Sequence, residues 1–191
     1  TGYLSGGTAW YRKHFILPDD ICGKRVRVTF GGIYKHSRIW INSNYLGGWA
    51  YGYSTFTFDI SDFVRAGENV VCVRVEHEQV ADSRWFTGSG IYRDVTLEIT
   101  EKSCFEKDGV FVTTKNIENG NAIINVEFST IDCDETEFIV EDKDGNCVAT
   151  AGGNADGNCD AVIDSASLWS PDSPYMYKLV CHAFKDGEIK D

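Results

Sequence analysis

Residues 83–93 read Ser-Arg-Trp-Phe-Thr-Gly-Ser-Gly-Ile-Tyr-Arg. Aromatic residues and two arginines surround a Gly-Ser-Gly core, and glycines permit backbone turns that other residues resist. Trp, Tyr and Arg together form flat, partly polar surfaces that suit a ligand or another domain. An aromatic-rich junction between strands of an all-β core fits the same residues. The stretch therefore predicts a loop between strands, with either a binding or a packing role.

The segments on both sides of this stretch have the two-residue period of β-strands. In residues 24–30, Val26, Val28 and Phe30 alternate with polar side chains, which indicates one buried and one solvated face. Further segments expected to be strands are 10–17, 37–42, 55–60, 70–76, 95–99, 109–114, 122–128, 138–142 and 175–184. Short strands with turn signals roughly every 8–12 residues predict an all-β protein made of β-sandwiches. A parallel α/β fold is excluded because crossover helices are missing.

The charge is distributed unevenly along the chain of 191 residues, whose net charge is −11. Residues 1–100 carry 11 Lys+Arg and 10 Asp+Glu, whereas residues 101–191 carry 7 lysines, no arginine and 19 Asp+Glu. This shift predicts two domains, 1–100 and 101–191. The acidic half is a poor partner for phosphate backbones, so we expect no nucleic acid as a partner. No apolar run approaches the roughly 18 residues that span a bilayer, so we also expect no membrane span.

The cysteines and histidines do not form a metal-binding pattern. All 7 cysteines stand singly, without a Cys-x-x-Cys pair, and the 4 histidines are equally dispersed. An odd number of cysteines in a chain of this size indicates mostly reduced thiols. We therefore expect no metal and no cofactor. The compartment stays open, with bacterial cytoplasm and periplasm both possible.

Several motifs in family order resemble the N-terminal part of family 2 glycoside hydrolases. The first set is similar to that family's sugar-binding jelly roll: Gly32-Ile33-Tyr34, Trp40-Ile41-Asn42, Leu46-Gly47, Tyr51-Gly52-Tyr53, Phe56 and Asp59-Ile60. Residues 73–75 followed by 83–93 resemble its closing signature, especially in bacterial β-galactosidases. Residues 168–172 with Pro174, Tyr175 and Tyr177 resemble the hallmark of the immunoglobulin-like domain that follows. One departure is Ser43, where the family usually has a glycine.

The resemblance implies the fold and function of a larger enzyme. It implies a galactose-binding-like jelly roll over 1–100, an immunoglobulin-like sandwich over 101–191, and a downstream (α/β)₈ barrel of the same chain as partner. In the family two barrel glutamates carry out retaining hydrolysis of a carbohydrate substrate. This chain is shorter than a barrel of roughly 250 residues and lacks βα alternation. We therefore expect a non-catalytic fragment, truncated within the second sandwich, with no catalytic residue of its own.

The resemblance also selects candidate site residues. Family enzymes direct a jelly-roll loop toward the barrel mouth, so the candidates near substrate are Asp82, Ser83, Arg84 and Trp85. Arg84 would donate hydrogen bonds to sugar hydroxyls, or else hold the Gly-Ser-Gly turn by buried hydrogen bonds. For Arg93 we expect the second, structural role.

The other aromatic residues and the aspartates near turns also have expected roles. Trp49, Tyr51 and Tyr53 lie in a glycine-rich loop and are candidates for stacking on a sugar, or else for packing on a neighbouring domain. Core packing is expected for Trp40 and Trp169. The aspartates around glycine-containing turns are expected to form those turns: Asp142, Asp144, Asp156 and Asp160.

Three functions follow from these residues. The first is the non-catalytic N-terminal part of a β-galactosidase-like hydrolase that acts on terminal β-galactosides. The second is a stand-alone carbohydrate-binding module. The third is a structural pair of sandwiches, which requires that Trp49 and Trp85 be buried. An oligomer is compatible with each of them.

Overall fold

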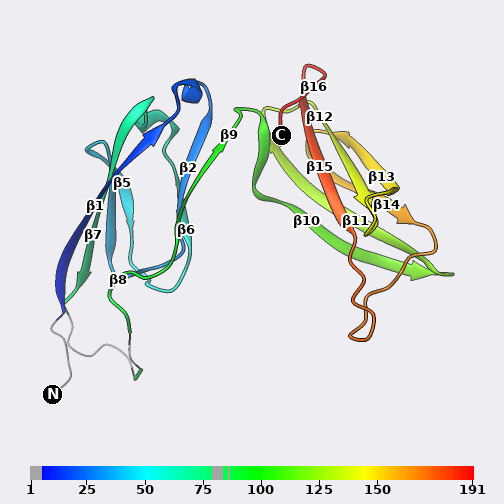
Figure 1. Cartoon of the computed structure of the whole chain (residues 1–191), viewed down its shortest axis with the longest axis horizontal. Coiled ribbons are helices and arrows are strands. Elements are labelled where there is room, and N and C mark those ends of the chain that lie inside the picture. Colours follow the sequence, from blue (N-terminus) through cyan, green and yellow to red (C-terminus); the bar gives the residue numbers. More distant parts are fainter. Residues whose placement is uncertain (1–5, 79–83, 86) are drawn as a thin grey trace. The chain divides into compact units, whose positions relative to one another are not determined.

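A computed structural model describes residues 6–78, 84–85 and 87–191, and it divides into two compact units with the boundary between Thr100 and Glu101. Both units are built from antiparallel strands (Figure 1). Within the described residues the helical segments are two short 3₁₀ turns, Asp19–Ile21 and Ser61–Phe63. Asp82 and Ser83 lie outside the described residues. The all-β class predicted from the sequence is confirmed.

The first unit contains two main sheets that face each other (Figure 1). The strand orders are β1-β7-β4-β5 and β6-β2-β9, and a small ladder pairs β3 with β8. The bounds are β1 Gly7–Leu17, β2 Arg25–Phe30, β3 Ile33–Tyr34, β4 Ser37–Ile41, β5 Asn44–Trp49, β6 Phe56–Asp59, β7 Gly67–His77, β8 Gly90–Ile91 and β9 Val95–Thr100.

The core of this unit follows the period of its strands. Val26, Val28 and Phe30 of β2 are at most 5% exposed, as their alternation predicted. They meet the inward residues of the other sheet, among them Ile39 and Ile41 of β4, both fully buried. Two sheets that bury their inner faces against each other form a β-sandwich.

Trp40 does not lie in the core, and the expectation that it packs there is wrong. Since Ile39 and Ile41 point inward, the strand period turns Trp40 to the outer face of the sheet. There its ring lies 5.3 Å from that of Trp10 on β1 and 5.3 Å from that of Tyr45 on β5. Trp10 and Tyr45 are 63% and 55% exposed.

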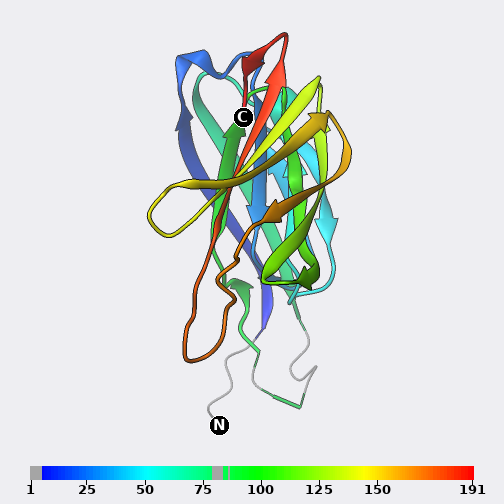
Figure 2. The same cartoon turned by 90° about the vertical axis from the view of Figure 1, so that its right-hand side faces the viewer.

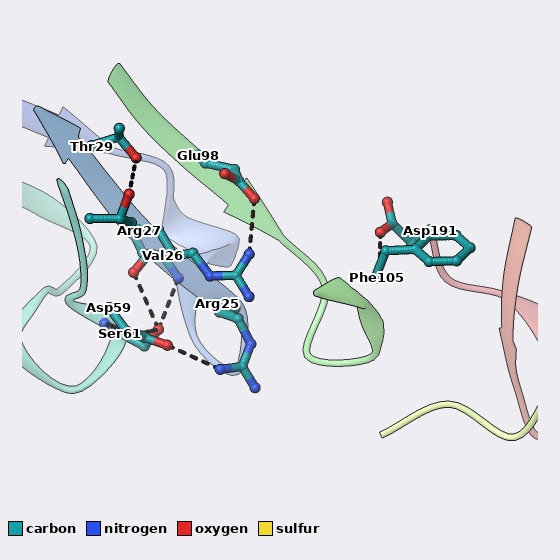
Figure 3. A network of polar contacts seen from close by, with 10 residues as sticks. Arg25, Val26, Arg27, Thr29, Asp59, Ser61, Glu98, Phe105 and Asp191 are labelled. Atoms are coloured by element: carbon teal, nitrogen blue, oxygen red, sulfur yellow. Dashed lines mark hydrogen bonds and ion pairs between the residues drawn. The ribbon is translucent and has the colours of Figure 1, made fainter. Parts of the chain in front are cut away.

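Two ion pairs brace the β6-β2-β9 sheet (Figure 3). Arg27 of β2 donates to Glu98 of β9 at 3.0 Å, although the arginine is only 8% exposed. Arg25 donates to Asp59 of β6, also at 3.0 Å. Glu98 lies directly opposite Arg27 in the strand register, whereas Arg25 reaches Asp59 diagonally, since Asp59 is opposite Arg27. The two pairs therefore link β2 to both of its neighbouring strands.

The second unit is a separate pair of sheets, ordered β10-β11-β14 and β13-β12-β15-β16. The bounds are β10 Cys104–Glu118, β11 Asn121–Ile131, β12 Glu135–Glu141, β13 Cys147–Asn154, β14 Gly157–Ile163, β15 Lys178–Lys185 and β16 Glu188–Ile189. Its core contains Val126, Phe128 and Phe138. The Phe105 backbone N–H donates to the Asp191 carboxylate at 2.9 Å (Figure 3).

The hairpin between β12 and β13 turns at residues 142–146 and is drawn in yellow in Figure 2. The Asp142 carboxylate accepts from the backbone N–H groups of Asp144 and Asn146. This is the turn-forming role expected for Asp142. Trp169, in contrast, is 60% exposed, so the expectation that it packs in the core is wrong.

Candidate functional site

Trp85 and Tyr92, from the stretch 83–93, both hydrogen-bond to the glycine-rich loop after β5. The indole Nε1 of Trp85 donates to the Tyr53 hydroxyl at 2.8 Å. The Tyr92 hydroxyl donates to the carbonyl oxygen of Gly52 at 2.9 Å. Because Trp85 and Tyr53 are 32 residues apart in the sequence, the fold brings together two of the segments selected from sequence.

Tyr53 is the centre of a cluster of aromatic rings. Its ring lies 5.3 Å from Tyr34, 5.7 Å from Tyr51 and 6.5 Å from Tyr92. Tilted and edge-to-face pairs at these separations are favourable for aromatic rings. Tyr51 is the outermost member, 63% exposed. A side chain at Gly52 would collide with the Tyr34 ring, so glycine is required for this close approach.

Trp49 makes different contacts from Tyr51 and Tyr53. Its ring stacks on Phe56 at 5.2 Å, and Phe56 stacks on the core residue Phe30, also at 5.2 Å. Its indole Nε1 donates to the Ser54 hydroxyl at 2.8 Å, and the residue remains 40% exposed. Trp49 is thus the exposed end of a column of stacked rings that is anchored in the core.

The segment Gly88-Ser89-Gly90 contacts residues of β7 and β1. The Ser89 hydroxyl lies 2.6 Å from Nδ1 of His77. Gly90 has a φ of +85°, and a side chain there would collide with the Tyr11 hydroxyl. Only glycine adopts this backbone conformation without strain, so the turn depends on Gly90.

Arg84 and Trp85 are both exposed, Trp85 by 64%. Among the described residues no hydrogen bond of the Arg84 guanidinium is recorded, so the buried structural role weighed for it is not observed. Arg93 does make structural contacts, since its guanidinium donates long bonds to the carbonyl oxygens of Gly31 and Tyr53, at 3.4 and 3.5 Å. The Arg93 guanidinium also lies over the Tyr92 ring, 5.2 Å from its centre.

The acidic residues singled out from sequence bond to neighbouring strands and turns. Asp160 accepts from Lys115 and Asn125, and these bonds lower the pKa of its carboxyl. Asp156 accepts from the Thr130 backbone N–H at 2.6 Å. Within the part of the chain that the structure describes, no group of three or more His, Cys, Asp or Glu side chains could hold a metal ion.

The side chains at the candidate site are suited to binding a ligand. Exposed phenol and indole rings offer faces for stacking on the apolar C–H face of a sugar, and Arg84 offers a planar donor for hydroxyls. Tyr92 and His77 also support the site, a role that their sequence context did not indicate. Tyr92 lies within residues 83–93, but its hydrogen bond to Gly52 spans 40 residues, and no local sequence pattern indicates such a contact.

Comparisons with known families cover nearly the whole chain. The family described as "Glycosyl hydrolases family 2, sugar binding domain" matches residues 4–101, and that described as "Glycosyl hydrolases family 2" matches residues 93–191. No helix among the described residues is long and apolar enough to cross a membrane.

Individual relatives are longer than this chain. It is 33% identical over 205 residues to the β-galactosidase BoGH2A of Bacteroides ovatus, covering 100% of this chain and 24% of that protein. It is 32% identical over 196 residues to a putative β-glucuronidase of Formosa agariphila, covering 100% of this chain and 19% of that protein. The chain thus spans a quarter or less of these relatives.

A solved structure of similar fold comes from the same family. The crystal structure of a glycosyl hydrolase family 2 member from Bacteroides cellulosilyticus superposes with a TM-score of 0.89 at 35% identity, over 100% of this chain and 28% of that one. The two consecutive family matches agree with the boundary between the two sandwiches. The chain therefore belongs to glycoside hydrolase family 2, of which it carries the sugar-binding domain followed by the immunoglobulin-like domain.

Proposed function

We propose that this chain is the non-catalytic N-terminal part of a retaining glycoside hydrolase that cleaves terminal β-galactosides. The catalytic (α/β)₈ barrel lies downstream in the same protein. The observation that carries the proposal is that this chain matches two consecutive family 2 domains. Its relatives are about four to five times longer than this chain.

The substrate class rests on the relatives. Several are β-galactosidases, including those of Bacteroides ovatus and Thermoanaerobacter pseudethanolicus, at 33% and 29% identity. The proteins of Formosa agariphila carry the name β-glucuronidase instead. Because β-galactosidases are the more frequent among these relatives, galactoside is the first choice and glucuronide the alternative to be tested.

In this proposal the joined loops border the substrate pocket of the whole enzyme. The hydrogen bond between Trp85 and Tyr53 positions the indole, and the exposed Arg84 guanidinium is available to sugar hydroxyls. Substrate-positioning groups of this kind act on binding and orientation rather than on bond cleavage. Asp82 and Ser83 are part of the same proposal on sequence grounds.

The experiment is an assay of the protein encoded by the complete gene with p-nitrophenyl β-galactoside, β-glucuronide and β-mannoside. The expected result is hydrolysis of the galactoside with retention of anomeric configuration, and no hydrolysis by the 191-residue chain alone. In the whole enzyme, Trp85→Ala is expected to raise KM several-fold, with Trp169→Ala as an equally exposed control. A complete gene without a barrel would overturn the proposal, and preference for the glucuronide would correct its substrate.

A stand-alone carbohydrate-binding module is the second candidate, favoured by the exposure of Trp49 and Tyr51, 40% and 63%. Calorimetric titration of the isolated chain with galactosides separates the two, since a module of this kind releases heat at millimolar sugar. The structural pair of sandwiches requires buried Trp49 and Trp85. Their exposed fractions of 40% and 64% argue against it.

A further inference from the structure

A groove lies on the outer face of the β1-β7-β4-β5 sheet, built from residues other than those of the candidate loops. The groove measures about 760 Å³ and is lined by Trp10, Arg12, His14, Trp40, Asn42, Ser43, Arg65, Val70 and Cys72. Pockets for small ligands commonly measure about 300–1,000 Å³. We call this surface the outer groove.

The register of the strands explains why these side chains share one face. Arg12 pairs with Cys72, and Cys72 pairs in turn with Trp40. Directly opposed residues of antiparallel strands point to the same side of the sheet. Trp10 and His14 are each two residues from Arg12 along β1, so they point outward with it.

An aromatic row crosses the outer groove. The rings of Trp10 and Trp40 are 5.3 Å apart and inclined by 32°, and Tyr45 continues the row 5.3 Å beyond Trp40. With Trp10 and Tyr45 63% and 55% exposed, the row offers ring faces to a ligand. Since neighbouring rings already contact each other, the row forms a platform for stacking and leaves no slot for a flat base to insert.

Positive charge surrounds the platform. The lining contains two arginines and one histidine, and no aspartate or glutamate. His14 contacts Glu68 at 2.8 Å, but no ion pair of Arg12 or Arg65 is recorded within the described residues. The amide of Asn42 is fully used, since it donates to Phe63 and Asn69 and accepts from Val70. The permanently charged donors of the groove are therefore the two guanidiniums.

We propose that the outer groove binds an acidic saccharide, with a sugar ring stacked on Trp10 and Trp40 and its carboxylates paired with Arg12 and Arg65. Guanidinium and carboxylate form two parallel charge-assisted hydrogen bonds, which neutral hydroxyls do not match. This site is independent of the proposed hydrolase activity.

The test uses the 191-residue chain and two probes that differ only in charge, α-1,4-linked digalacturonate and its dimethyl ester. Binding is followed by NMR through the indole N–H signals of the five tryptophans. Digalacturonate is expected to shift the Trp10 and Trp40 signals, and the ester to bind at least tenfold more weakly. Equal binding of both probes, shifts confined to Trp49 and Trp85, or no shift at millimolar digalacturonate would each overturn the proposal.

Matched variants locate the site. Arg12→Gln and Arg65→Gln are each expected to weaken digalacturonate binding about tenfold, because a charge-assisted pair is lost. Lys13→Gln removes the same charge from the opposite face of β1 and should leave binding unchanged. Trp10→Ala should abolish the Trp40 shift, whereas Trp169→Ala, at a similar exposure, should not. If Lys13→Gln weakens binding as much as Arg12→Gln, charge alone is responsible and the site is wrong.

The other conceivable occupant is the acidic half of a second copy of this chain. Sedimentation velocity at low salt distinguishes it, since the proposal expects the same sedimentation for the native chain and Arg12→Gln. A dimer that Arg12→Gln dissociates would overturn the proposal in favour of self-association. Failure of digalacturonate binding would leave the hydrolase assay of the whole enzyme unaffected, so the two proposals fail separately.

Discussion

The indole Nε1 of Trp85 donates a 2.8 Å hydrogen bond to the hydroxyl of Tyr53, and this bond joins two loops that are far apart in the sequence. Tyr53 in turn contacts the rings of Tyr34, Tyr51 and Tyr92. The exposed indole is therefore oriented by a tyrosine whose own ring is fixed by three neighbours. Such support preorganises a side chain for binding.

A double-mutant cycle measures this orientation. Trp85→Phe and Tyr53→Phe each remove one partner of the hydrogen bond, and we expect a coupling free energy of about 0.5–1 kcal/mol, since both groups are near solvent. Backbone amide exchange of residues 87–93 should accelerate in either single variant and no further in the double variant. Tyr51→Phe is the control, because no hydrogen bond of the Tyr51 hydroxyl is recorded among the described residues. Additive effects would show that the bond does not position the loop.

Gly90→Ala should destabilise the first unit. The left-handed backbone costs about 1–2 kcal/mol for an L-residue, and the collision with Tyr11 adds about 1–3 kcal/mol. Chemical denaturation measures the loss, with Gly67→Ala as control, since its φ is +77° but no atom lies near a new side chain. Tyr11→Phe should restore part of the stability in Gly90→Ala. Equal losses for Gly90→Ala and Gly67→Ala would mean that the collision is relieved at no cost.

Asp59 should stabilise the fold in a pH-dependent way. Burial alone would raise the pKa of its carboxyl, but hydrogen bonds from Ser61 and Arg25 outweigh burial and lower it. Because the folded-state pKa is depressed, the stabilisation is present above about pH 4 and is lost as pH falls through the folded-state pKa.

Urea denaturation of Asp59→Asn and the native chain between pH 7 and pH 2.5 tests this expectation. At pH 7 the variant should be less stable by about 0.5–1 kcal/mol, a modest value because the side chain is 45% exposed. The two stabilities should converge at the acidic end. Asp62→Asn serves as control, and a difference for Asp59→Asn that persists unchanged to pH 2.5 would contradict the assignment.

The cysteines should divide into fast and slow groups in alkylation by iodoacetamide. Partial burial raises the pKa of the Cys133, Cys159 and Cys181 thiols, which keeps them protonated at pH 8 and slows their reaction. Cys22 and Cys147 are exposed and should react first. Peptide mass spectrometry over time measures the order, and urea should abolish the difference. Labelling of Cys181 as early as that of Cys22 in the native chain would contradict its raised pKa.

The strand pattern in the sequence determined most of the fold. The alternation of Val26, Val28 and Phe30 with polar residues correctly predicted a half-buried strand, because the side-chain period of a strand is purely local. The same rule placed Trp40 opposite Ile39 and Ile41. It could not show that this opposite face is the outside of the sheet, and for that reason the core role expected for Trp40 was wrong. Trp169 lies in the loop between β14 and β15, where no strand period indicates which side chains are buried.

By itself, the sequence determined the all-β class, the family motifs and the change in charge after residue 100, since each is written in neighbouring residues. Only the tertiary structure decided which aromatic residues meet. Trp85 reaches Tyr53, Tyr92 reaches Gly52, and Trp10 reaches Trp40 across the intervening strand β7. Contacts of this kind depend on how the sheets pair and pack, and the local sequence around each residue does not indicate its distant partner.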